Sequence, residues 1–194
     1  MWGDSLSPTR SLRFGKLTSI ARIKGACVYV HWSVILIAAV ILVNARQKPV
    51  LTLVGLFSYL GVLVVHECGH LVAAQRMGTR VYAIEIYPIF GITRFQIPWS
   101  RFDHFVIAWG GVLAQLVVAT PLVAWVIVFG YTPFESVNAL LAIMGFFSIG
   151  VAIFNLLPIA PLDGAIAWDL FPAVFQRAMA RRNKRLRAGR GRKY

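Results

Sequence analysis

Acidic residues and cysteines are scarce in this sequence. Of its 194 residues, seven are Asp or Glu, 20 are Lys or Arg, and two are cysteine. Cys27 and Cys68 lie in separate apolar runs, so we predict small buried side chains and no disulfide framework. Charged residues make up 14% of the chain and hydrophobic ones 58%, which is more apolar than one soluble core can hide. The composition excludes an ordinary soluble domain and predicts an integral membrane protein.

Four apolar runs are long enough, or nearly so, to cross about 30 Å of hydrocarbon as helices. They cover residues 25–43, 50–74, 105–129 and 137–157. Between the second and third runs, residues 81–97 alternate in polarity around Pro88 and Gly91, which predicts a short β-hairpin. We therefore expect an all-α polytopic membrane protein of about four transmembrane helices. The hairpin would be membrane-associated, and a broken segment would follow the fourth helix.

Most basic residues lie on one side of the predicted helices. They precede the first helix, separate the second from the third and follow the fourth, where nine occur between Arg177 and Lys193. The opposite loops carry only Arg46 and Lys48. The positive-inside rule therefore predicts a multi-pass protein with both termini in the cytoplasm.

The predicted helices divide the chain into three parts. We expect a basic cytoplasmic segment over 1–24, a membrane core over 25–176 and a polybasic cytoplasmic tail over 177–194. A tail rich in Arg and Gly also suits a nucleic-acid-binding arm. Its position directly after the membrane core favours contact with anionic lipid instead, so we expect lipid contact and no nucleic-acid partner.

The second apolar run contains the pattern H-E-x-x-H, as His66-Glu67-Cys68-Gly69-His70. Four residues apart on a helix, the two imidazoles project from nearly the same face and can share one metal ion. Glu67 is suited to take a proton from an activated water molecule and to pass it to a leaving amine. These residue types favour zinc and hydrolytic chemistry. A purely structural role is disfavoured, because ionisable side chains without partners in lipid cost several kcal/mol.

Two histidines require a further ligand. The candidates are His31, Glu85, Asp103, His104, Glu135, Asp163 and Asp169. The topology puts Glu135 across the membrane from the motif, and Asp103 and His104 suit the start of the third helix. Asp163 is the best candidate, because two prolines and a glycine break the chain around it, and freed backbone groups need protein or a wet cavity. The alternative role of Asp163 is a cap in a helix-ending turn.

Asn155 places a neutral amide in an otherwise apolar run, just before this break. It would either hydrogen-bond the freed carbonyl groups or hold a substrate backbone. The residues alone leave both roles open.

These two segments together resemble the site-2 protease family of intramembrane zinc metalloproteases. The first half is the His66 to His70 motif, and the second is Asp163 within N-x-x-P-x-x-P-L-D-G, 93 residues after His70. The resemblance runs from about residue 30 to residue 164. It includes the start of the first helix at 30–33, the hairpin at 87–92 and a glycine-containing motif at 110–115. The departures are Val112 where Pro is common, Gln115 where Asn is common and Ala165 where a second Gly is frequent.

By this resemblance His66, His70 and Asp163 bind one zinc ion, Glu67 is the general base and Asn155 contacts substrate. The resemblance also implies a transmembrane or membrane-associated protein substrate, regulated intramembrane proteolysis and a bacterial inner membrane. Because the motif lies late in its helix, we expect cleavage near the cytoplasmic face. We further predict that the free hairpin edge pairs with unwound substrate; the alternative is a hairpin that only connects helices.

Two other functions are consistent with the scaffold. A catalytically silent family member would bind a membrane partner, but the intact Glu67 disfavours this alternative. A metal transporter would carry ion sites along several helices, whereas the ionisable residues here gather at one depth.

Overall fold

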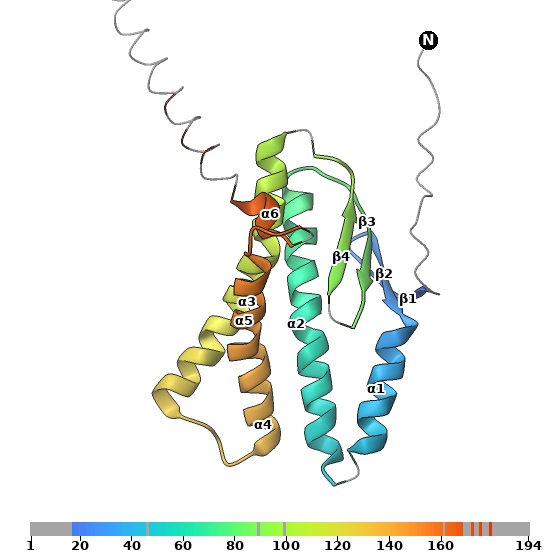
Figure 1. The fold of residues 1–194 in the computed structure, drawn as a ribbon, viewed down its shortest axis with the longest axis vertical. Helices are drawn as coiled ribbons and strands as arrows, with labels where there is room; N and C mark the ends of the chain where they lie inside the picture. The colour runs from blue at the N-terminus through green and yellow to red at the C-terminus, as the bar shows by residue number, and fades with distance from the viewer. Residues whose placement is uncertain are drawn as a thin grey trace, which may run out of the picture.

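The computed structural model describes residues 17–45, 47–88, 90–98, 100–160 and 162–168, together with residues 172, 175 and 179. Most of the predicted segment 1–24 and all of the tail 177–194 except residue 179 therefore lie outside the described residues. A long central helix, α2 (Pro49–Arg76), separates two groups of elements (Figure 1). On one side of α2 lie α3 (Arg101–Phe129) and the helical run of α4 (Glu135–Leu140), η1 (Leu141–Phe147) and α5 (Ser148–Asn155). On the other side lie α1 (Trp32–Asn44) and a β-sheet.

Three helices in the described part of the chain are long and apolar enough to cross a membrane. They are Pro49–Arg76, Arg101–Phe129 and Glu135–Asn155. They confirm the apolar runs predicted at 50–74, 105–129 and 137–157. The last of these helices contains the π-helical segment η1. The chain leaves the helix after Asn155, as expected, and the described residues between 156 and 168 include the short α6 (Gly164–Ala167).

The prediction of a spanning helix over 25–43 is wrong at its start. Residues Ala26–His31 form strand β2, which pairs with β1 (Leu17–Ile23). Lys24 and Gly25 have φ values of 46° and 89°, which allows the two-residue turn that joins the strands. The remaining helix α1 has 13 residues, so it extends about 20 Å, less than the hydrocarbon thickness of about 30 Å.

The predicted hairpin exists as β3 (Val81–Ile86) and β4 (Gly91–Phe95), but it is part of a larger sheet. The order is β1-β2-β3-β4, with β2 and β3 parallel and the two other pairs antiparallel. Parallel strands require a crossover connection, and α1 and α2 provide it here. The fold is therefore mostly helical with a small sheet, not all-α, and β4 is an edge strand of the described sheet.

The sheet packs against α2 through a cluster of apolar side chains. The buried members are Ala26, Val28, Leu63, Leu71, Ile84 and Ile86. Where water reaches this end of the molecule, burial of these side chains stabilises the fold by about 25 cal/mol for each Å² of apolar surface removed from water. The packing fixes the sheet beside the part of α2 that carries the H-E-x-x-H motif.

The backbones of helices α2 and α3 are in contact where two glycines meet. A Cβ atom on Gly69 would collide with the Gly110 carbonyl and lie 2.7 Å from Ala114 Cβ. A Cβ atom on Gly110 would lie 2.7 Å from Ala73 Cβ. Small residues allow membrane helices to bring their backbones together in this way. Because Gly69 precedes His70 directly, this contact sets the distance between the imidazoles and α3.

We predict that Gly69→Ala lowers the stability of the folded protein by about 1–3 kcal/mol, because the added methyl group forces α2 and α3 apart. Thermal unfolding in detergent measures the effect. Gly150→Ala is the matched control: Gly150 also lies in a helix, but nothing lies within 4 Å of its added Cβ atom. An unfolding midpoint for Gly69→Ala equal to that of the wild type would contradict the prediction.

Candidate functional site

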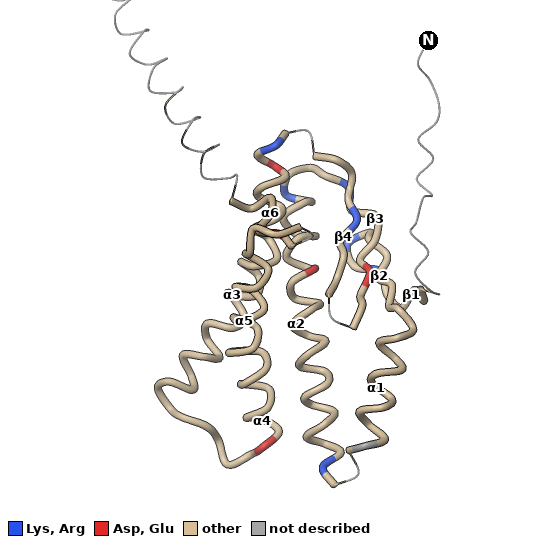
Figure 2. Tube along the Cα trace, in the orientation of Figure 1, with Lys and Arg blue, Asp and Glu red and all other residues tan. Residues whose placement is uncertain are grey.

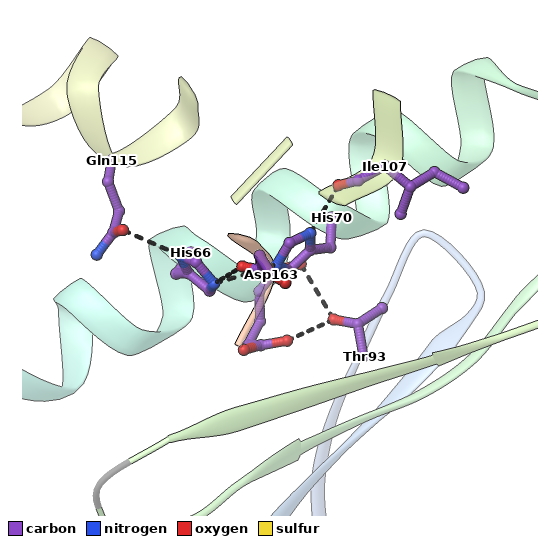
Figure 3. Close-up of polar contacts among 7 residues, drawn as sticks. His66, His70, Thr93, Ile107, Gln115 and Asp163 are labelled. Atoms are coloured by element: carbon purple, nitrogen blue, oxygen red, sulfur yellow. Dashed lines mark hydrogen bonds and ion pairs between the residues drawn. The ribbon is translucent and has the colours of Figure 1, made fainter. Parts of the chain in front are cut away.

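Two side chains of α2 and one from a distant part of the sequence converge (Figure 3). His66 Nε2 and His70 Nε2 lie 3.0 Å apart, and Asp163 Oδ2 lies 2.9 Å from the first and 3.2 Å from the second. Both histidines are buried, whereas the Asp163 side chain is 23% exposed. These atoms form a group that could hold a metal ion. The structure therefore brings together the three residues that the sequence predicted as ligands.

The far side of each imidazole makes a hydrogen bond to α3. His70 Nδ1 lies 2.8 Å from the Ile107 carbonyl oxygen, and His66 Nδ1 lies 2.9 Å from Gln115 Oε1 (Figure 3). An oxygen acceptor requires a protonated Nδ1 on the ring. In a neutral ring, the lone pair is then on Nε2, which is the atom that faces the other two members of the group.

This arrangement fits a cation. Two Nε2 lone pairs and a carboxylate oxygen point at one another across about 3 Å, where they repel unless a positive charge lies among them. Atoms that bind one tetrahedral zinc ion at about 2.0–2.2 Å have a similar mutual spacing. The donor set of two imidazoles and one carboxylate is a typical zinc set.

One face of α3 forms the wall of this group. Ile107, Gly111 and Gln115 are spaced four residues apart, so they lie along one stripe of the helix. A Cβ atom on Gly111 would lie 2.6 Å from His70 Nε2 and 2.7 Å from His66 Cε1. Only glycine leaves room for both rings at this position, between the two hydrogen-bond acceptors.

Glu67 lies beside the histidines and is held by β4. The residue is 3% exposed, and Thr93 Oγ1 donates a hydrogen bond of 2.7 Å to its Oε2. The other oxygen, Oε1, lies against Gly91, where a Cβ atom would be 2.5 Å from Glu67 Cδ. The strand therefore leaves space for the carboxylate by means of a glycine and fixes one of its oxygens by means of a threonine.

Hydrogen bonds from two tryptophan side chains hold the segment that carries Asp163 in place. Trp109 Nε1 donates to the Ala167 carbonyl at 2.9 Å, and Trp168 Nε1 donates to the Leu156 carbonyl at 2.6 Å. A Cβ atom on Gly164 would collide with the Leu156 backbone, so the turn requires glycine there. The first of these hydrogen bonds holds the broken segment against α3, and the second joins the two ends of the segment.

The Asp163 side chain does not cap α6, so the alternative role as a helix cap is wrong. The side chain faces the histidines instead. Burial raises the pKa of the Asp163 carboxyl group, but its proximity to the His66 and His70 rings outweighs burial and holds the pKa below its usual value. The carboxylate is therefore in its ionised, metal-binding form.

Two adjoining cavities open at this group. One has a volume of about 320 Å³ and is lined by all three converging residues, Glu67 and part of β4. The second, of about 480 Å³, extends between α2, η1 and α5 and is lined mostly by apolar side chains. Asn155 lines both cavities, so the structure places it beside the group.

The other candidate ligands lie elsewhere or have other partners. Three of them are paired: His31 with Ser33, Glu85 with Arg94 and Glu135 with Lys48. Asp103 lies in the first turn of α3, where Ser100 caps the helix. His104 lines the smaller cavity but does not belong to the group of three. Asp169 lies outside the described residues.

The sequence analysis gave no role to Gln115 or Thr93. A fully buried amide in an apolar helix is a signal for Gln115, because such a group needs a partner. The contact of Thr93 with Glu67 has no signal of this kind, because it depends on how the sheet packs on α2. The Ile107 carbonyl is a backbone group, which the sequence cannot identify.

Three comparisons show which known proteins the chain is similar to. The sequence profile of peptidase family M50 matches residues 118–190, a range that includes Asn155 and Asp163. A Synechocystis sp. protein that carries the name of a zinc metalloprotease is 26% identical over 125 residues, which are 56% of this chain. Those residues are 30% of that protein, so the chain spans about a third of the length of the curated relative it matches.

The fold matches a solved structure. The site-2 protease from Methanocaldococcus jannaschii superposes with a TM-score of 0.58 and 22% sequence identity, over 84% of this chain and 73% of the other. At this identity the match concerns the fold. The family profile over residues 118–190, the zinc metalloprotease relative and the fold together support the site-2 protease family for this chain.

Proposed function

We propose that the chain is an intramembrane zinc metalloprotease that hydrolyses peptide bonds in or near the transmembrane segments of membrane-bound substrates. The observation that carries this proposal is the convergence of His66, His70 and Asp163 beside the Glu67 carboxylate in one cavity. A site that only stored metal would not need a carboxylate in that place. The presence of the Glu67 carboxylate therefore supports a hydrolytic site over one that only binds metal.

His66, His70 and Asp163 would hold one zinc ion through Nε2, Nε2 and Oδ2. When bound, zinc supplies Lewis acidity, which polarises a scissile carbonyl and lowers the pKa of water. The chain contributes the orientation of the ligands: the Ile107 carbonyl and Gln115 Oε1 hold the two rings from behind. The ionised Asp163 offsets part of the positive charge.

Glu67 would be the general base. Its Oε2 accepts the hydrogen bond from Thr93, and its Oε1 lies against Gly91 of β4. In this role the carboxylate takes a proton from the attacking water and donates it to the leaving amine. The carboxylate lines both cavities, so water and substrate can reach it from either.

Asn155 would contact the substrate backbone. It lies at the end of α5, where the two cavities join, and its amide offers both a donor and an acceptor. A transmembrane segment would enter through the larger, mostly apolar cavity between α2 and α5. In this scheme Asn155 meets the segment just before it reaches the metal ligands.

Strand β4 would bind the substrate by strand addition. A transmembrane helix satisfies its own backbone hydrogen bonds, so it must unwind before its carbonyl groups are open to attack. β4 is an edge strand, and Gly91, Thr93 and Phe95 line the smaller cavity beside the ligands. An extended substrate paired with this edge would pass directly over Glu67.

We place the site near the cytoplasmic face of a bacterial inner membrane, with both termini in the cytoplasm. The support is the distribution of charge: Lys and Arg gather at the end of the molecule where α2 ends and α3 begins (Figure 2). His66 and His70 lie in the second half of α2, toward this end. By the positive-inside rule, the products of regulated intramembrane proteolysis would leave inward.

We predict that Glu67→Gln lowers the rate of cleavage of a reporter transmembrane substrate by about 10²–10⁴-fold and leaves the zinc content unchanged, because it removes the base and keeps the ligands. The measurement compares cleavage and bound zinc in purified proteins. Glu135→Gln is the matched control, because this carboxylate lies at the opposite end of the helices and pairs with Lys48. Equal cleavage by the wild type and Glu67→Gln would refute the proposal, and zinc without cleavage in either would favour a binding protein.

We predict that Phe95→Pro reduces kcat/KM for a transmembrane reporter by about tenfold, the worth of one or two backbone hydrogen bonds. Gln96 donates its N–H to Arg80, so in the alternating antiparallel ladder the neighbouring Phe95 N–H points to the free edge. Proline removes that donor and is tolerated on an edge strand. Phe95→Val keeps the N–H and controls for the lost ring; equal rates for the two variants would contradict strand addition.

A further inference from the structure

Gln115 is a fully buried polar residue in the middle of a predicted transmembrane helix. It is 0% exposed, and its Oε1 accepts the hydrogen bond from His66 Nδ1 at 2.9 Å. Its Nε2 has no hydrogen-bond partner among the described residues. An apolar side chain of the same size would avoid the cost of burying this amide, so the bond to His66 must account for its presence.

We propose that Gln115 is a positioning residue that holds His66 with Nδ1 protonated and Nε2 free for the metal. This inference rests on the zinc site of the proposed function, but not on the proteolytic activity. Hydrogen-bond partners of ligating histidines fix both the tautomer and the direction of the ring. Without such a partner, the His66 ring can rotate or protonate Nε2, and either change removes a ligand.

The two histidines differ in how much they depend on a side chain. His70 is held by the Ile107 carbonyl, a backbone group that substitution does not remove. His66 is held by Gln115 alone among the hydrogen bonds of its Nδ1 in the described structure. Gly111, which lies between them on α3, has no side chain to replace the acceptor. A substitution at position 115 can therefore change the orientation of the proposed ligand His66 while His66 itself stays in place.

The chemistry of the amide suggests a discriminating pair of substitutions. Gln115→Met keeps the length and removes the acceptor. Gln115→Glu presents an oxygen in either orientation of the terminal group and adds negative charge, which makes the imidazole a better donor of its Nε2 lone pair. The two variants separate the role of the acceptor from that of side-chain volume.

The experiment measures the zinc dissociation constant of the full-length protein in detergent by competition with a chelator, without substrate. We expect Gln115→Met to raise the constant about 10–100-fold and Gln115→Glu to leave it unchanged or lower it. Val112→Ala is the control for disturbed packing, because Val112 is 1% exposed on the same helix and makes no hydrogen bond to a ligand. We expect it to lower the unfolding midpoint and leave zinc binding unchanged.

Zinc binding by Gln115→Met as tight as that of the wild type would overturn the proposal, as would equal weakening in Gln115→Met and Gln115→Glu. Tight zinc binding by the wild type without cleavage of any substrate would remove the protease proposal and leave the role of Gln115 standing. A wild-type protein that binds no zinc would overturn both. The absorption spectrum of the Co²⁺-loaded proteins gives a second readout, because it reports the geometry of the ligands and not catalysis.

A second and independent contact concerns the base. Thr93 Oγ1 donates to Glu67 Oε2 at 2.7 Å and also lies 3.3 Å from the Glu67 carbonyl oxygen. We infer that Thr93 is a positioning residue that aims the Glu67 carboxylate into the cavity, an inference that rests on the general-base role proposed above. Because Thr93 belongs to the strand proposed to receive substrate, docking of the substrate and alignment of the base would share one element.

The test compares Thr93→Val, which keeps the shape and removes the donor, with Thr93→Ser, which keeps the donor. A lost hydrogen bond to a charged group predicts a fall in kcat of about 10–100-fold for Thr93→Val, with KM and zinc affinity unchanged. Thr93→Ser restores most of the rate. A rise in KM alone, or equal loss in both variants, would overturn the role of Thr93, whereas absence of cleavage by the wild type would refute the base assignment itself.

Discussion

The backbone contact between Gly69 of α2 and Gly110 of α3 is the constraint on which the rest of the site depends. With no side chain between them, the two helices are close enough for α3 to reach behind both imidazoles. His66 and His70 lie one helical turn apart on α2, and their hydrogen-bond partners Gln115 and Ile107 lie two turns apart on α3. A wider separation would lengthen both hydrogen bonds together, because both acceptors are on α3.

The burial of His66, Glu67 and His70, and the partial burial of Asp163, require that each of these side chains has a partner. Two imidazoles and two carboxyl groups within a largely apolar helical protein are expensive unless each has a partner. The structure supplies these partners to every group except at the point where His66 Nε2, His70 Nε2 and Asp163 Oδ2 meet. A cation at that point would complete the balance of charge. The same reasoning applies to Glu67, whose partner Thr93 comes from the sheet rather than from a helix.

Much of the architecture could be predicted from local patterns. Hydropathy identified the three long helices, because each must present apolar side chains over a length that spans the bilayer. Alternation in polarity identified β3 and β4. The first strands were missed, because Ala26–His31 is both apolar and adjacent to the apolar helix α1, so one continuous hydropathy signal concealed the turn at Lys24 and Gly25. Pairing of β2 with β3 joins segments separated by two helices, which no local pattern encodes.

The sequence by itself determined which residues make up the first half of the candidate site: the spacing of His66, Glu67 and His70 places two proposed ligands and the proposed base on one helix, since the helical repeat is fixed by the backbone. It also singled out Asp163, through the prolines and glycine that break the chain around it. Only the tertiary structure decided which groups orient these residues. Gln115 and Thr93 reach their partners through the packing of α3 and β4 on α2, and the Ile107 carbonyl is a group that every residue carries, so its role depends on position in space alone.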